Sequence, residues 1–319
     1  MGGRAALHRQ RPGPVTAAVR RTRAERWAPY GLVAPFFVLF GAFGLFPLLY
    51  TGWASLHRVE LTALDRWEWV GPGNYVRLAA DPYFWNALGN TFLIGVLATV
   101  PQLLLALGVA HLLDARLRAR GLFRVVALAP YATSVAAATL VFALFFGREH
   151  GPVNWALTGL GLAPVDWQNG PWAAKAAVAA IVVWRWTGYN ALIYLAAMQT
   201  VPRELYEAAA LDGASRWRRF AHVTLPALRP TILFTVVVST IGATQLFGEP
   251  LLFDAGTGAS GGADRQFQTL GLYLYEQGWV NLHLGRASAI AWVMLLLLLL
   301  VFGAARLVRR GLGRGPDAR

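Results

Sequence analysis

The chain has 319 residues, of which 56% are hydrophobic and only 14% are charged, whereas a soluble globular domain usually carries about 25% charged residues. Because it contains no cysteine, disulfides, thiolate metal sites and cysteine nucleophiles are excluded. The net charge of +13 comes almost entirely from arginines at the edges of apolar runs, which fits an integral membrane protein better than a nucleic-acid-binding patch.

The chain is predicted to begin with an arginine-rich tail and a first membrane span. Residues 1–30 combine arginine with glycine and proline, a composition typical of a disordered tail. Residues 31–53 are an uncharged run of 23 residues, which is enough to cross about 30 Å of hydrocarbon. The run is too long for a typical signal-peptide core and no small-residue cleavage site follows it, so we expect a retained span that tolerates Pro35 and Pro47.

Further apolar runs alternate with polar loops along the rest of the chain. The residues of 54–85 are rich in tryptophan and tyrosine, and we assign these rings to the water–lipid interface, where they are commonly enriched. The other spans are predicted at residues 86–111, 125–146, 172–198, 231–247 (or as far as 252) and 284–307. The predicted fold is an all-α membrane protein with six transmembrane helices, with a membrane domain at 31–308 between tails at 1–30 and 309–319.

The arginines also predict the orientation in the membrane. The two tails, the end of the last span and the loops at 112–124 and 199–230 hold 21 basic residues, whereas the opposite loops and the first residues of the last span hold six. Loops rich in Lys and Arg stay in the cytoplasm. We therefore expect both termini inside, and the loops at 54–85, 147–171 and 254–283 outside.

The stretch from Glu207 to Pro230 is too polar for a span and is predicted to form two short helices. Gly213 can take the left-handed conformation that closes the first helix, and Ser215 can cap the second. Trp217 and Phe220 then fall three residues apart on one apolar face. From these features alone, a basic helical hairpin lying on the membrane surface and a docking element are equally compatible with the sequence.

A longer pattern in this stretch resembles the cytoplasmic loop signature of binding-protein-dependent ABC importer permeases, which is Glu-Ala-Ala, three residues, Gly, nine residues, Ile, any residue and Leu-Pro. Val223 stands in place of the Ile, and every other position matches. The resemblance implies a coupling helix that docks on a separate ATPase subunit. It implies coupling roles for Glu207, Ala208, Ala209, Asp212, Gly213, Ser215, Phe220 and Pro226.

The resemblance extends over about residues 30–308. Motifs such as Phe46-Pro47-Leu48-Leu49-Tyr50 and Ala129-Pro130-Tyr131 look like the sugar-type branch, which includes maltose and glycerol-3-phosphate permeases. The glycine-rich residues 256–262 depart from the shorter element usual there. The resemblance implies a second permease subunit, two cytoplasmic ATPase subunits, an extracytoplasmic solute-binding protein and the cytoplasmic membrane of a prokaryote. Since the only lysine, Lys175, follows Ala174, no phosphate-binding loop is possible, and we expect ATP and Mg²⁺ on the partner subunits and no cofactor or metal here.

Within the spans, Arg185 is the outstanding polar residue. It lies 13 residues into the fourth predicted span, where a charge is costly and normally faces a partner or a water-filled cavity. Two interpretations remain open: it lines a sugar pathway together with nearby aromatic rings, or it binds the carbonyls of a helix that breaks near Gly188. Glu249 fits a solvated helix terminus better. The candidate pathway residues are Arg185, Tyr189, Asn190, Thr244, Gln245 and Glu249.

The predicted function is the permease subunit of an ATP-driven importer of a sugar or related polyol, which catalyses no bond change. An importer of a non-sugar solute is the nearest alternative, because the coupling motif is widely shared. A secondary transporter would be expected to show a coupling-ion site and internal repeats, and neither is evident. A membrane-bound enzyme would need a paired catalytic constellation, which the sequence lacks.

Overall fold

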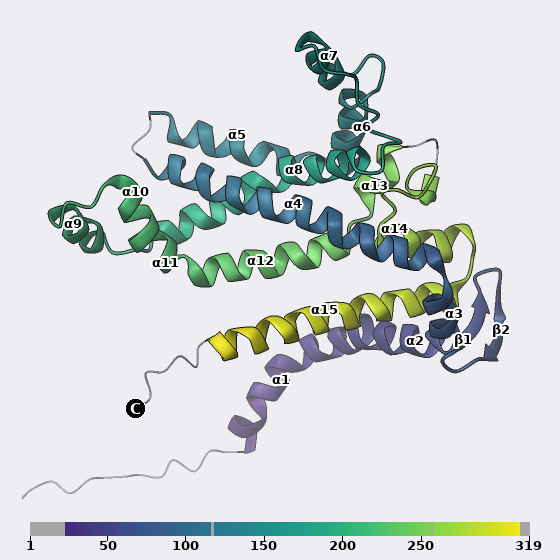
Figure 1. Cartoon of the computed structure of the whole chain (residues 1–319). Coiled ribbons are helices and arrows are strands. Elements are labelled where there is room, and N and C mark those ends of the chain that lie inside the picture. The colour runs from purple at the N-terminus through teal and green to yellow at the C-terminus, as the bar shows by residue number, and fades with distance from the viewer. Residues whose placement is uncertain (1–22, 116–117, 255, 257, 313–319) are drawn as a thin grey trace, which may run out of the picture. The chain divides into compact units, whose positions relative to one another are not determined.

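The structure is a computed structural model that describes residues 23–115, 118–254, 256 and 258–312. The described residues up to Tyr50 and those from Thr51 onward form two compact units (Figure 1). Much of the two predicted tails lies outside the described residues. Helix already begins at Arg23, inside the predicted tail, and the last helix continues to Leu312.

The first unit is the predicted first span. Helix α1 (Arg23–Phe40) continues through a π-helical turn (Gly41–Leu45) into α2 (Phe46–Ser55), which runs on into the second unit. Pro47 lacks an N–H, so a helix through it must release one carbonyl, and the wider π turn just before α2 accommodates this loss. The predicted interruption by proline is therefore a local change of helix type within one span.

Two long helices form the frame of the second unit. Helix α4 (Pro82–Asp114) begins at Asp81, whose side chain accepts a hydrogen bond from the Tyr83 N–H, and packs along α8 (Ala173–Met198). Small buried residues such as Ala98 and Ala177 let the two helices approach closely. Helix α5 (Arg120–Ala132) lies beside α8, and α12 (Arg229–Thr244) lies beside α4 (Figure 1).

Two of the predicted spans are broken. The third, predicted as continuous over 125–146, consists of α5 and α6 (Val135–Phe145), which meet at an angle of 90°. Pro130 weakens the end of α5, and the Ser134 hydroxyl accepts from the Ala137 N–H to start α6 in a new direction. The span predicted over 125–146 is therefore a bent pair of helices, and the sequence analysis did not predict the bend.

The chain also bends just before the fifth predicted span and breaks near its end. The segment α10 (Arg216–Arg219), a π turn (Phe220–Thr224) and α11 (Leu225–Ala227) lead into α12 at an angle of 67°. Helix α12 ends at Thr244, and a separate helix, α13 (Gly248–Phe253), follows. Gln245 and Glu249 are four positions apart, a spacing that would put them on one face of a helix, but they do not lie in one continuous helix.

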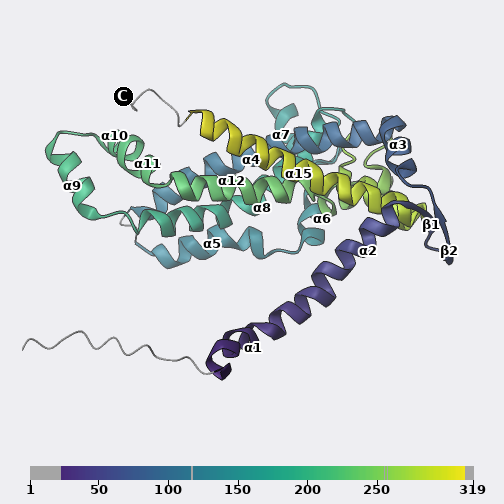
Figure 2. The same ribbon diagram turned by 90° about the horizontal axis from the view of Figure 1, so that it is seen from below.

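The segments between the spans contain short elements. Strands β1 (His57–Glu60) and β2 (Ala63–Trp69) form an antiparallel hairpin, so the prediction of an all-α fold was wrong for this loop. Helix α3 (Gly73–Ala80) follows, and both lie at the end where α15 (Leu284–Leu312) begins (Figure 2). The remaining elements are α7 (Pro152–Gly159), α9 (Arg203–Leu211), a 3-10 turn (Gly258–Ser260), α14 (Leu270–Tyr275) and a π turn (Glu276–Val280).

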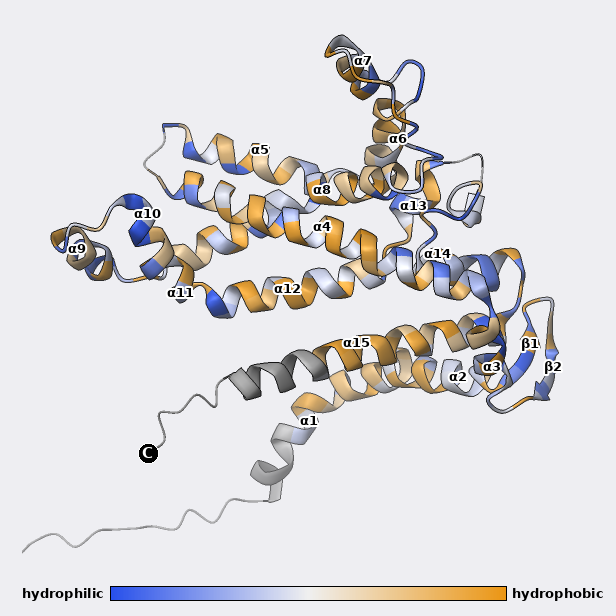
Figure 3. Ribbon diagram, in the orientation of Figure 1, coloured by the Kyte–Doolittle hydropathy of each residue, from blue (hydrophilic) through white to orange (hydrophobic). Residues whose placement is uncertain are grey.

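Length and composition mark four helices of the described chain as able to cross a membrane, or up to six spans if each bent pair is counted as one. The four are Tyr30–Ser55, Pro82–Asp114, Ala173–Met198 and Leu284–Gly303. Hydrophobic residues cover the middle of these helices, and hydrophilic residues gather around α10 and the β1–β2 hairpin (Figure 3). The chain is therefore a helical, multi-pass membrane protein.

Gly188 lies where α5 and α8 are closest. A Cβ atom built there would overlap the carbonyl oxygen of Ala127, which is backbone and cannot swing away. Gly188 thus serves the crossing of two helices. It does not break α8, which runs without interruption from Ala173 to Met198.

We predict that Gly188→Ala destabilises the protein, because α5 and α8 must separate to admit the methyl group. Overpacking of this kind costs about 1–3 kcal/mol, which should lower the melting temperature of the purified protein by roughly 2–9 °C. Gly108→Ala in α4 is the matched control, since a Cβ there meets nothing within 4 Å. Equal melting temperatures for the two variants would contradict the close crossing.

Candidate functional site

A cavity of about 650 Å³ lies among the helices of the second unit. Residues of α4, α8 and α12 form its walls, and residues of α6 and α13 close one end. Most of the lining is apolar. The polar or aromatic lining residues are Thr99, Gln102, Arg185, Trp186, Tyr189, Asn190, Ser239, Gln245, Phe247 and Glu249.

An ion pair is buried in the cavity wall. The Nη1 atom of Arg185 donates to Oε1 of Glu249 at 2.8 Å, and the two side chains are only 9% and 7% exposed. A longer contact of 3.5 Å joins Nη2 to the carbonyl oxygen of Thr133, at the break between α5 and α6. The guanidinium therefore connects three segments: α8, the α5–α6 break and α13.

The break after α12 brings Glu249 to Arg185. Gly248 starts α13 tightly against α6, where an added Cβ would be 2.8 Å from a methyl carbon of Val135. This contact turns the first residues of α13 toward α8. The prediction that Glu249 is a solvated helix terminus was therefore wrong, since the residue is 5% exposed and paired.

Aromatic rings form a second part of the lining. The ring of Tyr189 stacks on that of Tyr131 at 4.6 Å, and Trp186 meets Tyr189 edge-on at 5.7 Å. Trp186 and Tyr189 line the cavity, and Asn190 follows on the same helix with its amide donating to the Trp186 carbonyl at 3.1 Å. Rings beside amide and hydroxyl groups can contact a molecule that has both apolar faces and hydroxyl edges.

Five of the six predicted pathway residues line this one cavity, and Thr244 does not. The Thr244 hydroxyl donates to the Ile241 carbonyl of its own helix at 2.8 Å. Three polar lining residues were missed: Thr99 and Gln102 on α4 and Ser239 on α12. The side chains of Gln102 and Ser239 hydrogen-bond at 3.0 Å. A lone glutamine within an apolar run is a signal that the sequence offered for Gln102.

The predicted coupling residues lie together at the other end of α8. Helices α9 and α10 are joined at Gly213, which has a φ of 75°, and the Ser215 hydroxyl accepts from the Arg218 N–H at 3.3 Å. Glu207, Ala208 and Asp212 are exposed on this loop. Leu211 and Trp217 are 90% and 74% exposed, so the loop also presents apolar surface.

One contact holds the loop together and another fastens it to a span. The hydroxyl groups of Tyr206 and Thr224 are 3.0 Å apart, and the ring of Phe220 packs on His111 of α4 at 4.7 Å. Phe220 is therefore an anchor of the loop, and Pro226 begins the short helix that leads into α12. These contacts leave the exposed tip of the loop available to a partner.

Comparison with known proteins identifies the family. Residues 102–314 match the family described as binding-protein-dependent transport system inner membrane component. The chain belongs to this family. The match includes the cavity helices α8 and α12 and the loop between them.

Individual relatives cover most of the permease. It is 40% identical over 247 residues to the lactose transport system permease protein LacF of Rhizobium radiobacter, covering 76% of this chain and 80% of that one. It is 35% identical over 279 residues to the sulfoquinovosyl glycerol transport system permease protein SmoG of Agrobacterium fabrum, covering 85% and 89%. A chain of a bacterial alginate ABC transporter, crystallised with its alginate pentasaccharide-bound periplasmic protein, shares the fold with a TM-score of 0.76 at 21% identity, covering 91% and 97%.

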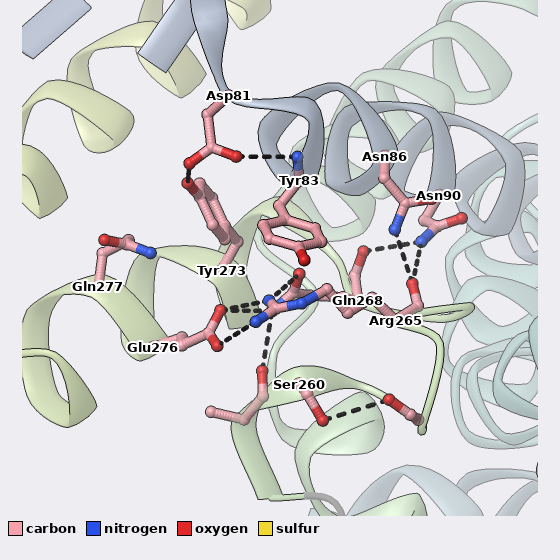
Figure 4. A network of polar contacts seen from close by, with 12 residues as sticks. Asp81, Tyr83, Asn86, Asn90, Ser260, Arg265, Gln268, Tyr273, Glu276 and Gln277 are labelled. Carbon is pink, nitrogen blue, oxygen red and sulfur yellow. Dashed lines mark hydrogen bonds and ion pairs between the residues drawn. The ribbon is translucent and has the colours of Figure 1, made fainter. Parts of the chain in front are cut away.

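A polar network supports the end of the permease where α13 and α14 lie (Figure 4). Arg265 forms two bonds with Glu276, at 2.6 and 2.7 Å, and its guanidinium lies 4.2 Å from the ring centroid of Tyr83. The bonds with Glu276 raise the pKa of Arg265 above its usual value. The backbone carbonyl of Arg265 accepts from Asn86 and Asn90 of α4, so the network fixes the segment between α13 and α14 onto α4.

We predict that Arg185→Met strongly destabilises the permease, because it leaves Glu249 buried without a counter-ion. Breaking a buried pair in this way costs about 3–5 kcal/mol, whereas removing both charges is often neutral. Arg185→Met/Glu249→Met is therefore the matched control and should recover most of the melting temperature. If the double variant has the same low melting temperature as the single variant, the loss of stability does not come from an unpaired Glu249.

Proposed function

We propose that the chain is one of two paired permease subunits of an ATP-driven importer that carries a sugar or related polyol through the 650 Å³ cavity. The relatives named for lactose and for sulfoquinovosyl glycerol support a sugar-type cargo, and the alginate transporter has the same fold. The rings of Trp186 and Tyr189 suit the apolar faces of a sugar, and the nearby amides suit its hydroxyl groups. A solute-binding protein outside would deliver this cargo.

The position of the coupling loop between two cavity walls is the observation that carries the proposal. Helix α8 lines the cavity and ends at Met198, and α12 lines its other wall and begins at Arg229. A displacement of the loop between them must therefore move both walls. When two ATPase subunits close on ATP, a loop docked on them would transmit the closure as a rigid-body rotation of α8 and α12.

The remaining features of the proposal concern topology and partners. Counting each bent pair as one span gives six spans, with both termini and the coupling loop in the cytoplasm of a prokaryote. The distribution of basic residues, 21 against six, supports this orientation. ATP and Mg²⁺ would bind to the partner subunits, because a chain with Lys175 as its only lysine has no phosphate-binding loop.

Substitutions of Gly213 test the coupling role. Its φ of 75° suits glycine and is tolerated by asparagine, but a β-branched residue strains it. We expect Gly213→Val to reduce co-purification of the ATPase subunits and substrate-stimulated ATP hydrolysis at least about tenfold, since a docked helix that loses its angle loses its contacts. Gly213→Asn should retain most of both. Equal activity of the valine and asparagine variants would contradict the role of this loop.

Single cysteines in this cysteine-free chain test the orientation. A membrane-impermeant thiol reagent added to intact cells should label Ser260→Cys and leave Ser215→Cys unlabelled. Permeabilised cells provide the control, because there both positions should react. The opposite labelling in intact cells would reverse the proposed topology.

A further inference from the structure

The electrostatic character of the cavity is set by two residues. Among its described lining residues, Arg185 and Glu249 are the only ones with a charged side chain. Their atoms meet at 2.8 Å, and both side chains are more than nine-tenths buried. The cavity thus contains one positive and one negative charge that cancel at short range.

The cancellation matters because a guanidinium in an open cavity would otherwise attract anions. Arginine keeps its charge at any physiological pH, and its fork geometry matches carboxylate, phosphate and sulfonate groups. An anionic sugar entering this cavity would have to separate the pair or lie against the Glu249 carboxylate. Both arrangements are disfavoured, because the two side chains are buried and the charges of buried groups are screened weakly.

A neutral sugar meets no such obstacle. The side chains of the other lining residues carry no charge that such a sugar would have to displace. Gln102, Ser239 and Gln245 add neutral donors and acceptors on the facing walls. The lining therefore offers hydrogen bonds without net charge.

We propose that Glu249 is a specificity-determining residue of the cavity: by neutralising Arg185 it makes the cavity select neutral glycosides over anionic sugars. The proposal rests on the proposed function, in which the cavity is the translocation path. It assigns to one carboxylate the distinction between neutral and acidic cargo, which family membership leaves open.

Charged thiol reagents measure this property directly. Ala136 on α6 lines the cavity and is exposed, so Ala136→Cys places a single thiol there. The purified transporter complex is treated with the sulfonate reagent 2-sulfonatoethyl methanethiosulfonate or with its trimethylammonium counterpart. The ratio of the sulfonate rate to the ammonium rate, divided by the same ratio for a free thiol in solution, reports the potential inside the cavity.

With the pair intact, we expect a normalised ratio near one. Glu249→Gln should raise the ratio roughly tenfold or more, because one positive charge is then uncompensated, and Arg185→Gln should lower it by a similar factor. The double variant Arg185→Gln/Glu249→Gln has no charge and should return the ratio to that of the parent. Misfolding would not shift the ratio in opposite directions in the two single variants. Size-exclusion chromatography of the complex checks that each variant is assembled.

Protection by sugars extends the test to the cargo. Lactose should slow modification of the introduced thiol in the parent more than lactobionate, its carboxylate-bearing oxidation product, and Glu249→Gln should reverse this order. Where neither sugar protects, the ratio of the reagents decides alone. The proposal is overturned if Glu249→Gln leaves the ratio unchanged, or if lactobionate protects the parent as well as lactose.

Failure of the proposed path has a different signature. If neither reagent modifies the thiol of Ala136→Cys in the parent complex, the cavity is closed to water and the proposed function fails with it. If both react but the charge variants do not shift their ratio, the path stands and the role of Glu249 is wrong.

Discussion

The ion pair between Arg185 and Glu249 is the interaction on which the cavity depends. A single buried charge among apolar helices is strongly destabilising, so each side chain requires the other as its counter-ion. The pair requires α13 to depart from the axis of α12, and the Thr133 contact reaches the break between α5 and α6. One guanidinium thereby ties together the two interrupted spans and the uninterrupted α8.

The helix breaks follow the rule that a backbone polar group away from water must find a partner. At the α5–α6 break, the Ser134 hydroxyl receives the Ala137 N–H. After α12, a side chain from a distant segment provides the partner: the Thr269 hydroxyl donates to the Leu246 carbonyl at 2.5 Å. Irregular backbone is tolerated at membrane depth where protein or a water-filled cavity surrounds it, and here both breaks border the cavity.

Rigid and adjustable parts are separated along the chain. Gly188 holds α8 against α5 with no space for a methyl group, and the Arg265 network fixes the segment before α14 onto α4. The coupling loop, in contrast, is fastened by Phe220 and Tyr206 and exposes its tip. In the proposed function, the exposed tip is the part of the loop that would meet the ATPase subunits, and the packed helices would move as units.

The sequence by itself determined the class of this protein. Apolar runs long enough for a bilayer located the spans, and the positions of Gly213 and Ser215 located the ends of two short helices, because these signals act over one or a few turns of helix. Arg185 could also be singled out from the sequence, because a charged residue within an apolar run is costly and must have a partner or face a water-filled cavity.

Only the tertiary structure decided what Arg185 contacts. Its partner Glu249 is 64 residues away, and it becomes a partner only because Ser134, Gly248 and Val135 redirect two helices toward α8. Hydrophobic periodicity gives no sign of a 90° bend between two apolar helices, because both halves are equally apolar. The burial of Glu249, the exclusion of Thr244 from the cavity and the inclusion of Gln102 all follow from these bends, which depend on contacts between residues far apart in the chain.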